Sequence, residues 1–287
     1  MGKIRFGRVG FFIEIVIICL ICGVFVLSVA IPYNTNSASA ANKGSSYIVM
    51  NASDCEVIEE SNSHLRLPMA STTKTMTALI VIENCRLDET VTVPAEAVGV
   101  EGSSVYLKKG DKYTVEELLY GLMLRSGNDA ATALAIHTAG SVKNFVEMMN
   151  YRAETMGLND THFVNPHGLH DDNHYTSAYD LCKIGCFAMK NDVFAKIVGT
   201  KKVTVGKGEL TRVWCNKNKI LSLYNGGNGI KTGFTKAAGR CLIASAERDG
   251  VTVVSVVLNR GDMFNDCMNL MDRAFDKISD KKDTNNQ

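Results

Sequence analysis

Apolar residues form one unusually long run near the N-terminus, from residue 9 to residue 31, interrupted by a single glutamate. Three basic residues precede it, and a small polar stretch containing Ala38-Ser39-Ala40 follows it. A basic start, an apolar middle and an A-x-A-like end are typical of a secretory signal peptide. The run is also long enough to span a bilayer as an uncleaved anchor. We therefore expect residues 1–40 to export the chain, and any membrane contact to be made through this segment alone.

Beyond residue 44 the pattern alternates between strand-like and helix-like periods. Short strand-like runs at 46–50 and 55–59 flank the turn residues Asn51-Ala52-Ser53-Asp54 and predict a hairpin. A capping box, Thr114-Val115-Glu116-Glu117, begins one of the helices that the middle of the chain predicts. These helices are expected over residues 71–85, 114–125, 129–138, 142–156 and 177–190.

Strand-like sequence returns in the last third of the chain. The elements expected there are a hairpin (201–205 and 209–215), two buried strands (240–247 and 251–259), an amphipathic helix (262–278) and a polar tail (279–287). Strands at both ends, with helices between them, favour one domain over residues 44–278. Its single sheet would be built from both ends of the chain and would carry a helical insertion.

Composition adds little to this picture. The chain is 46% hydrophobic and 21% charged, with a formal net charge of +1, so nothing in it favours a nucleic-acid partner. Two of the nine cysteines lie in the apolar leader, and the spacing of the others forms neither a C-x-x-C nor a zinc pattern. We interpret these cysteines as free thiols packed in the core. A disulfide between two of them is the alternative that the sequence leaves.

Ser71-Thr72-Thr73-Lys74 stands where a helix is expected to begin. Residues three apart share a helix face, so the Lys74 amine can approach the Ser71 hydroxyl and act as its base, once desolvation or a nearby cation lowers the amine's pKa. S-x-x-K alone is a weak motif, but Ser126-Gly127-Asn128 and Lys231-Thr232-Gly233 follow it in order. S-x-x-K, S-D-N and K-T-G together mark penicillin-binding proteins and class A β-lactamases.

Longer segments around these motifs resemble the serine-type D-alanyl-D-alanine carboxypeptidases, the low-molecular-mass penicillin-binding proteins. The resemblance covers roughly residues 44–278. It implies a β-lactamase/transpeptidase-like α/β (α+β) fold, in which helices flank an antiparallel sheet and an all-helical subdomain is inserted. The segments that carry it are 68–77, Ser126-Gly-Asn-Asp-Ala-Ala131, Phe163-Val-Asn-Pro-His-Gly-Leu169, His174-Tyr-Thr-Ser-Ala-Tyr-Asp-Leu181 and Gly229-Ile-Lys-Thr-Gly-Phe-Thr235.

The resemblance also implies an activity and a role for each matching residue. The enzyme would act outside the cytoplasm, at the membrane, in the wall or as a secreted protein. It would remove the terminal D-alanine from peptidoglycan stem peptides ending in D-Ala-D-Ala, would be acylated by β-lactams, and would need no metal or organic cofactor. The implied catalytic residues are Ser71 as nucleophile, Lys74 as proton acceptor and Ser126 as proton relay; the implied substrate-binding residues are Asn128, Lys231, Thr232, Gly233, Phe234 and Arg260, with the N–H groups of Ser71 and Phe234 as the oxyanion hole.

Alternatives on the same fold stay open at this point. A class A β-lactamase would carry E-x-x-L-N, but Glu154-Thr-Met-Gly-Leu158-Asn159 has one residue too many. Endopeptidase activity on cross-links and a non-catalytic wall-binding scaffold are further alternatives. Many relatives add a β-rich domain and a C-terminal membrane helix, and we expect neither here.

Three other patterns are interpreted as structural. Ile230 separates Gly229 from Lys231, which a phosphate-binding P-loop does not allow. We interpret residues 170–174, which include His170 and His174, as a polar loop rather than a metal site, and His137 as a packed helix residue.

Overall fold

The computed structural model describes residues 44–285. The predicted leader, residues 1–40, lies outside this range, so its role stays a prediction. Within residues 44–285, no helix has both the length and the apolar content needed to cross a bilayer.

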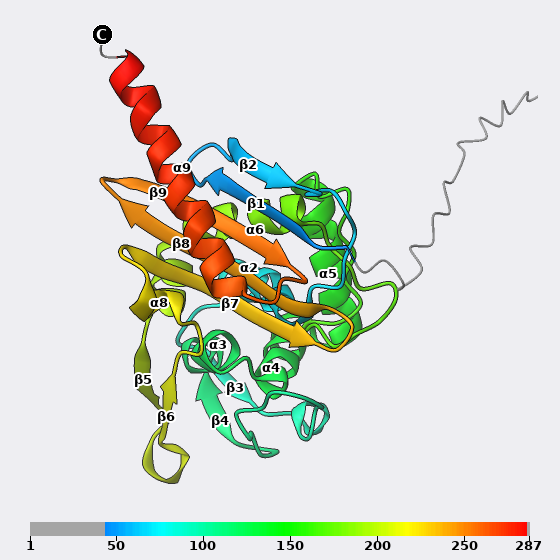
Figure 1. Cartoon of the computed structure of the whole chain (residues 1–287). Helices are drawn as coiled ribbons and strands as arrows, with labels where there is room; N and C mark the ends of the chain where they lie inside the picture. Colours follow the sequence, from blue (N-terminus) through cyan, green and yellow to red (C-terminus); the bar gives the residue numbers. More distant parts are fainter. Residues whose placement is uncertain (1–43, 286–287) are drawn as a thin grey trace, which may run out of the picture. The chain divides into compact units, whose positions relative to one another are not determined.

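One five-stranded antiparallel sheet joins the two ends of the described chain (Figure 1). The N-terminal hairpin pairs directly with the last strand, so that Val49 lies opposite Ser255. The strands, in spatial order, are β2 (Val57–Ser61), β1 (Ser46–Asn51), β9 (Val251–Leu258), β8 (Gly239–Arg248) and β7 (Gly227–Thr235). The single sheet built from both ends of the chain, which the sequence predicts, is therefore confirmed.

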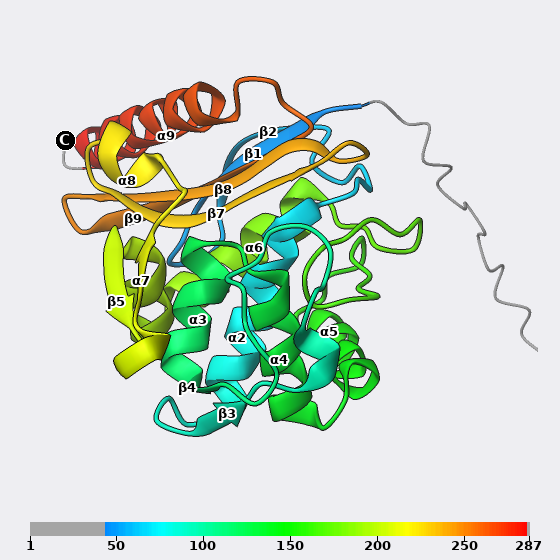
Figure 2. The ribbon, with the colours of Figure 1, turned by 90° about the horizontal axis from the view of Figure 1, so that it is seen from below.

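The central strands β8 and β9 are buried on both faces, because different layers cover the two sides of the sheet. Ile243 and Val256 face the helical side, whereas Leu242 and Val257 face the other side. This alternation follows from the period of two in a strand, and it explains why both strands are almost continuously apolar in sequence. Figure 2 shows the layers edge-on, with α9 (Met263–Asn285) on one face and the helical subdomain on the other.

The inserted segment forms the expected helical subdomain. Its predicted capping box is present at α3, where Thr114 and Glu117 exchange side-chain to backbone hydrogen bonds. Gly121 lies in the same helix, and the face on which it lies packs against Trp214. The helices are α2 (Lys74–Asn84), α3 (Val115–Leu124), α4 (Asn128–Ala139), α5 (Val142–Thr155), α6 (Ala178–Met189) and α7 (Asp192–Gly199).

The structure also departs from the sequence prediction in several places. The helix expected to end at residue 278 continues as α9 to Asn285, so the predicted polar tail is helical up to that residue. Strand β7, which begins at Gly227 and includes Lys231, has no counterpart among the strands predicted from the sequence. The remaining short elements are η1 (Ala70–Thr73), β3 (Thr90–Thr92), η2 (Ala95–Ala97), β4 (Lys112–Thr114), β5 (Lys202–Val205), η3 (Gly208–Leu210), β6 (Arg212–Cys215) and α8 (Ile220–Leu223).

The cysteines are free within the described residues. Cys182, Cys186, Cys241 and Cys267 are buried, as predicted for core thiols. The prediction is wrong for Cys215, which is exposed on β6.

Candidate active site

Ser71 lies in a 3₁₀ turn rather than in the first turn of an α-helix. The turn η1 runs directly into α2, and Lys74 is both its C-cap and the first residue of α2. Side chains three residues apart are aligned in a 3₁₀ turn, so this geometry brings serine and lysine together more directly than the predicted α-helix would. Ala70, just before the serine, has a φ of +49°, a left-handed conformation that costs free energy at a residue with a Cβ.

Three oxygen atoms surround the amine of Lys74, which is completely buried. Its Nζ lies 2.9 Å from Ser71 Oγ, 2.7 Å from Asn128 Oδ1 and 2.6 Å from the backbone oxygen of His167. The last two are carbonyl oxygens, which can only accept hydrogen bonds. A neutral amine therefore donates its two hydrogens to them, and its lone pair is left facing the Ser71 hydroxyl.

The pKa of Lys74 is well below its usual range. Burial is the main cause, because it disfavours the ammonium form, and the charge of Lys231 adds to the effect. The carboxylate of Asp129 acts in the opposite direction. Burial, followed by the charge of Lys217, also lowers the pKa of Lys231 to about 7. Burial and the neighbouring cation thus favour the neutral amine, the form in which Lys74 can accept the proton of Ser71.

A buried carboxylate supports the side of the site that carries Asn128. Asp129 follows it in the first turn of α4, and its oxygens accept hydrogen bonds from the Ser104 hydroxyl and from the backbone N–H groups of Val105 and Leu107. The side-chain amide of Asn128 donates to the backbone oxygen of Glu101. One loop is therefore held by two consecutive residues, and this fixes the oxygen of Asn128 toward the lysine.

Ser126 lies in the loop between α3 and α4, as the sequence predicts. It is buried, and its φ of +65° is again left-handed. Non-glycine residues in this conformation cluster at functional sites, where the surrounding structure compensates for the strain. The next residue, Gly127, is the N-cap of α4, and a Cβ there would lie 2.7 Å from a carboxylate oxygen of Asp129.

Strand β7 brings the third motif close to Ser71. A Cβ at Gly233 would lie 3.1 Å from both the backbone oxygen of Met69 and the backbone nitrogen of Ser71, so glycine allows the strand to approach the 3₁₀ turn closely. Lys231 is buried and donates to the backbone oxygen of Thr232. Phe234 is 65% exposed beside them.

The segment before α6 packs behind Ser71, a position that the sequence does not predict. Gly168, with φ +88°, lies directly against the backbone oxygen of Ala70. His174 Nε2 lies 2.8 Å from Thr73 Oγ1, and its Nδ1 accepts a hydrogen bond from the backbone of Val164. Burial lowers the pKa of His174 to about 3, so the ring is neutral. The loop predicted over residues 170–174 is confirmed, but His174 is buried in it and contacts Thr73, which its polar neighbours do not predict. Its signal was the segment from His174 to Leu181, which carried the resemblance without an assigned role.

Arg260 stands apart from these contacts. Its guanidinium forms an ion pair with Asp266 at 2.8 Å and lies over the ring of Tyr47. Asp266 belongs to α9, which covers the face of the sheet opposite the helical subdomain. A role for Arg260 at the substrate carboxylate stays a prediction.

The sequence matches the model of the D-alanyl-D-alanine carboxypeptidase family over residues 33–262. The chain belongs to this family. It is 40% identical over 211 residues to the D-alanyl-D-alanine carboxypeptidase of a Streptomyces species, covering 67% of this chain and 72% of that protein. It is also 34% identical over 227 residues to the D-alanyl-D-alanine carboxypeptidase DacF of Bacillus subtilis. This match covers 77% of the present chain but only 58% of DacF.

Solved structures of the family share this fold. The DD-transpeptidase of Streptomyces superimposes with a TM-score of 0.75 at 36% identity, over 80% of this chain and 95% of that one. The D-alanyl-D-alanine carboxypeptidase DacD of Francisella tularensis superimposes with a TM-score of 0.75 at 27% identity, over 80% of this chain and 70% of DacD. The β-lactamase/transpeptidase-like fold expected from the motifs is thereby confirmed.

Proposed function

We propose that this family member is a serine D-alanyl-D-alanine carboxypeptidase that removes the terminal D-alanine from peptidoglycan stem peptides. The observation that carries the proposal is the buried amine of Lys74, held between two carbonyl oxygens with its remaining position facing the Ser71 hydroxyl. Such a group activates a serine, which is a weak nucleophile at its free pKa.

In the proposed acylation, the proton of Ser71 passes to Lys74 as Oγ attacks the carbonyl carbon of the penultimate D-alanine. The backbone N–H groups of Ser71 and Phe234 stabilise the oxyanion, each worth roughly 3 kcal/mol in other acyl-transfer enzymes. The C–N bond then breaks, and Ser126 relays the proton from the lysine to the departing amino group of D-alanine. Water hydrolyses the ester and frees the serine.

The substrate is bound through its terminal carboxylate and its backbone amides. We assign the carboxylate to the ammonium of Lys231 and the hydroxyl of Thr232, and a substrate amide to Asn128. A peptide extended along β7 would pass the exposed ring of Phe234. Penicillin, which also carries a carboxylate beside a reactive carbonyl, is expected to acylate Ser71 and to leave slowly.

Slow release is expected because, within residues 44–285, the residue matching the deacylating glutamate of a class A β-lactamase does not face the site. Glu154, the nearest match to that motif, is exposed near the end of α5. Among the acidic residues described, Asp129 is close enough to affect the pKa of Lys74, but its oxygens already accept hydrogen bonds from one loop.

Transfer of the acyl group to an amine is the second candidate, because a solved relative at 36% identity is a DD-transpeptidase. The acyl-enzyme would be the same, and only the acceptor would differ. We further propose that residues 1–40 export the enzyme, which then acts on the wall outside the cytoplasm, either released or held by that segment.

The test uses the purified full chain and its Ser71→Ala variant with a diacyl-L-Lys-D-Ala-D-Ala peptide. Free D-alanine is assayed with and without an amine acceptor, and intact mass is recorded after benzylpenicillin. The proposal predicts D-alanine release without an acceptor and a stable penicilloyl adduct, both absent from Ser71→Ala. Release only when an acceptor is present would favour the transpeptidase, rapid penicillin turnover would favour a β-lactamase, and inertness in both assays would contradict an enzymatic role.

A further inference from the structure

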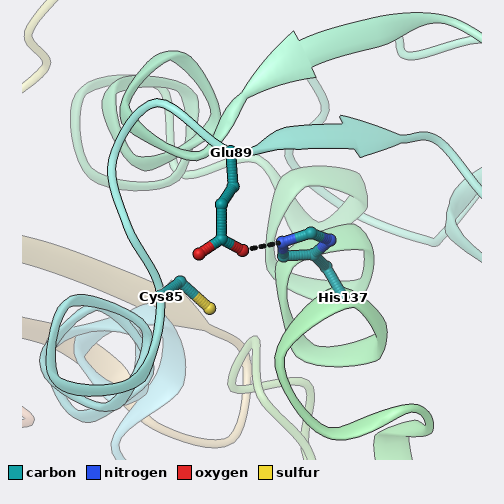
Figure 3. Close-up of side chains that lie close together, drawn as sticks. All are labelled: Cys85, Glu89 and His137. Carbon is teal, nitrogen blue, oxygen red and sulfur yellow. Dashed lines mark hydrogen bonds and ion pairs between the residues drawn. The ribbon is translucent and has the colours of Figure 1, made fainter.

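We propose that Cys85, Glu89 and His137 form a binding site for Zn²⁺ at the far end of the helical subdomain. One ligand atom from each residue lies within 4.8 Å of the other two. Figure 3 shows the three side chains converging from separate segments, with the carboxylate between the thiol and the imidazole. His137 Nε2 is 3.1 Å from an oxygen of Glu89. The sequence does not indicate this cluster, because His137 is 48 residues from Glu89 along the chain.

The donor set favours zinc over the other common divalent ions. Thiolate and imidazole ligands suit Zn²⁺, whereas Mg²⁺ and Ca²⁺ prefer shells made only of oxygen atoms. Three protein ligands leave the fourth tetrahedral position for water. All three residues are only partly buried, so an ion can reach them from solvent.

Neighbouring groups already orient the ligands, as outer-shell partners do in metal sites. The backbone N–H of Arg86 donates to the second oxygen of Glu89 at 2.8 Å. The sulfur of Cys85 lies 3.3 Å from the hydroxyl oxygen of Thr138, and that hydroxyl donates to the backbone of Leu134. The thiol is therefore the donor toward Thr138, and metal binding would replace its proton by the ion and release that proton to solvent.

The position of the site indicates a role in stability. Cys85 caps the C-terminal end of α2, Glu89 directly precedes β3, and His137 lies in the last turn of α4. The ion would tie these three segments together. Since α2 rises about 1.5 Å per residue over 11 residues, the site is roughly 16 Å along the helix from Lys74, too far to take part in the acyl transfer.

The proposal is tested with the metal-free full chain, titrated separately with Co²⁺ and with Zn²⁺. Co²⁺ bound to a thiolate gives a near-ultraviolet charge-transfer band, and we expect this band to saturate at one equivalent. Cys85→Ser should abolish the band. Loss of an outer-shell partner lowers metal affinity roughly 10- to 100-fold, and Glu89→Gln removes a direct ligand, so its affinity should fall by at least that factor. Zn²⁺ at a hundred times its dissociation constant should raise the Tm by roughly 5–10 °C.

The matched control is Cys215→Ser, which removes an exposed cysteine outside the cluster. It should bind Co²⁺ as the parent chain does. Acylation by penicillin, far from the cluster, verifies that each variant is folded. The proposal is overturned if no band forms at one equivalent, if Cys85→Ser keeps the band, or if Zn²⁺ raises the Tm of Cys85→Ser and of the parent equally.

Discussion

Replacing Gly168 by alanine tests whether the segment that packs behind Ser71 positions Ser71 and Lys74 for the proposed acyl transfer. A Cβ at this position would lie 1.9 Å from the backbone oxygen of Ala70 and 2.9 Å from Thr73 Oγ1. Ordinary contact begins at 3.4 Å, so the two backbones must separate by about 1.5 Å. One of them carries Ser71, and the other carries the His167 oxygen that binds Lys74.

The expected losses follow from this displacement. A misplacement of about 1 Å at reacting groups costs on the order of 100-fold in rate, so kcat/KM should fall by about 100-fold or more. Stability should fall as well, by roughly 2–5 kcal/mol. Of this, overpacking contributes roughly 1–3 kcal/mol and an alanine at left-handed φ roughly 1–2 kcal/mol.

The matched control is Gly110→Ala. Gly110 has a φ of +85°, almost the same as Gly168, but its added Cβ would meet nothing within 4 Å. It should lose only the roughly 1–2 kcal/mol of backbone strain and should keep its activity. D-alanine release, penicillin acylation rates and urea unfolding are measured on both variants. Equal activity of folded Gly168→Ala and Gly110→Ala would refute the proposed positioning role.

Three further predictions concern the buried polar groups. Asn128→Ala removes a hydrogen-bond acceptor from the buried Lys74 amine and should slow acylation roughly 5- to 150-fold, as leaving a buried donor without its acceptor does. An unchanged rate of penicilloyl formation would contradict this. The pH profile of kcat/KM should be bell-shaped, because the reaction needs a neutral Lys74 and a charged Lys231. The alkaline limb of the profile should lie near the Lys231 pKa of about 7, and this limb should move to higher pH in Lys231→Arg. Burial lowers the pKa of His174 to about 3 in the folded protein, whereas the unfolded chain keeps the ordinary pKa of about 6.5. As the pH falls below about 6.5, the unfolded state therefore binds the proton before the folded state does, and the free energy of unfolding decreases. Urea unfolding should show about 3 kcal/mol of this loss between about pH 7 and 4.5, and His174→Gln should lack it; an unchanged slope in the variant would count against the neutral buried ring.

Elements with a strong local signal were predictable from sequence. The capping box at Thr114 sets the start of α3, and the apolar runs of β8 and β9 indicate strands buried on both faces. Strand β7 gave no such signal. It contains glycines at Gly227, Gly229 and Gly233, and glycine is depleted in strands, so pairing with β8 rather than local propensity makes it a strand.

The candidate catalytic residues and their order along the chain are determined by the sequence alone, because the spacing of Ser71 and Lys74 is a local property. Only the tertiary structure decided what surrounds the lysine. Asn128 is 54 residues away along the chain, and His167 is 93. The same holds for His174. Its polar neighbours along the chain predict a loop, whereas only long-range packing buries its ring behind Ser71. Dihedral preferences and periodicity act over a few residues, whereas the burial that lowers the pKa of Lys74 arises only when segments distant in sequence pack together.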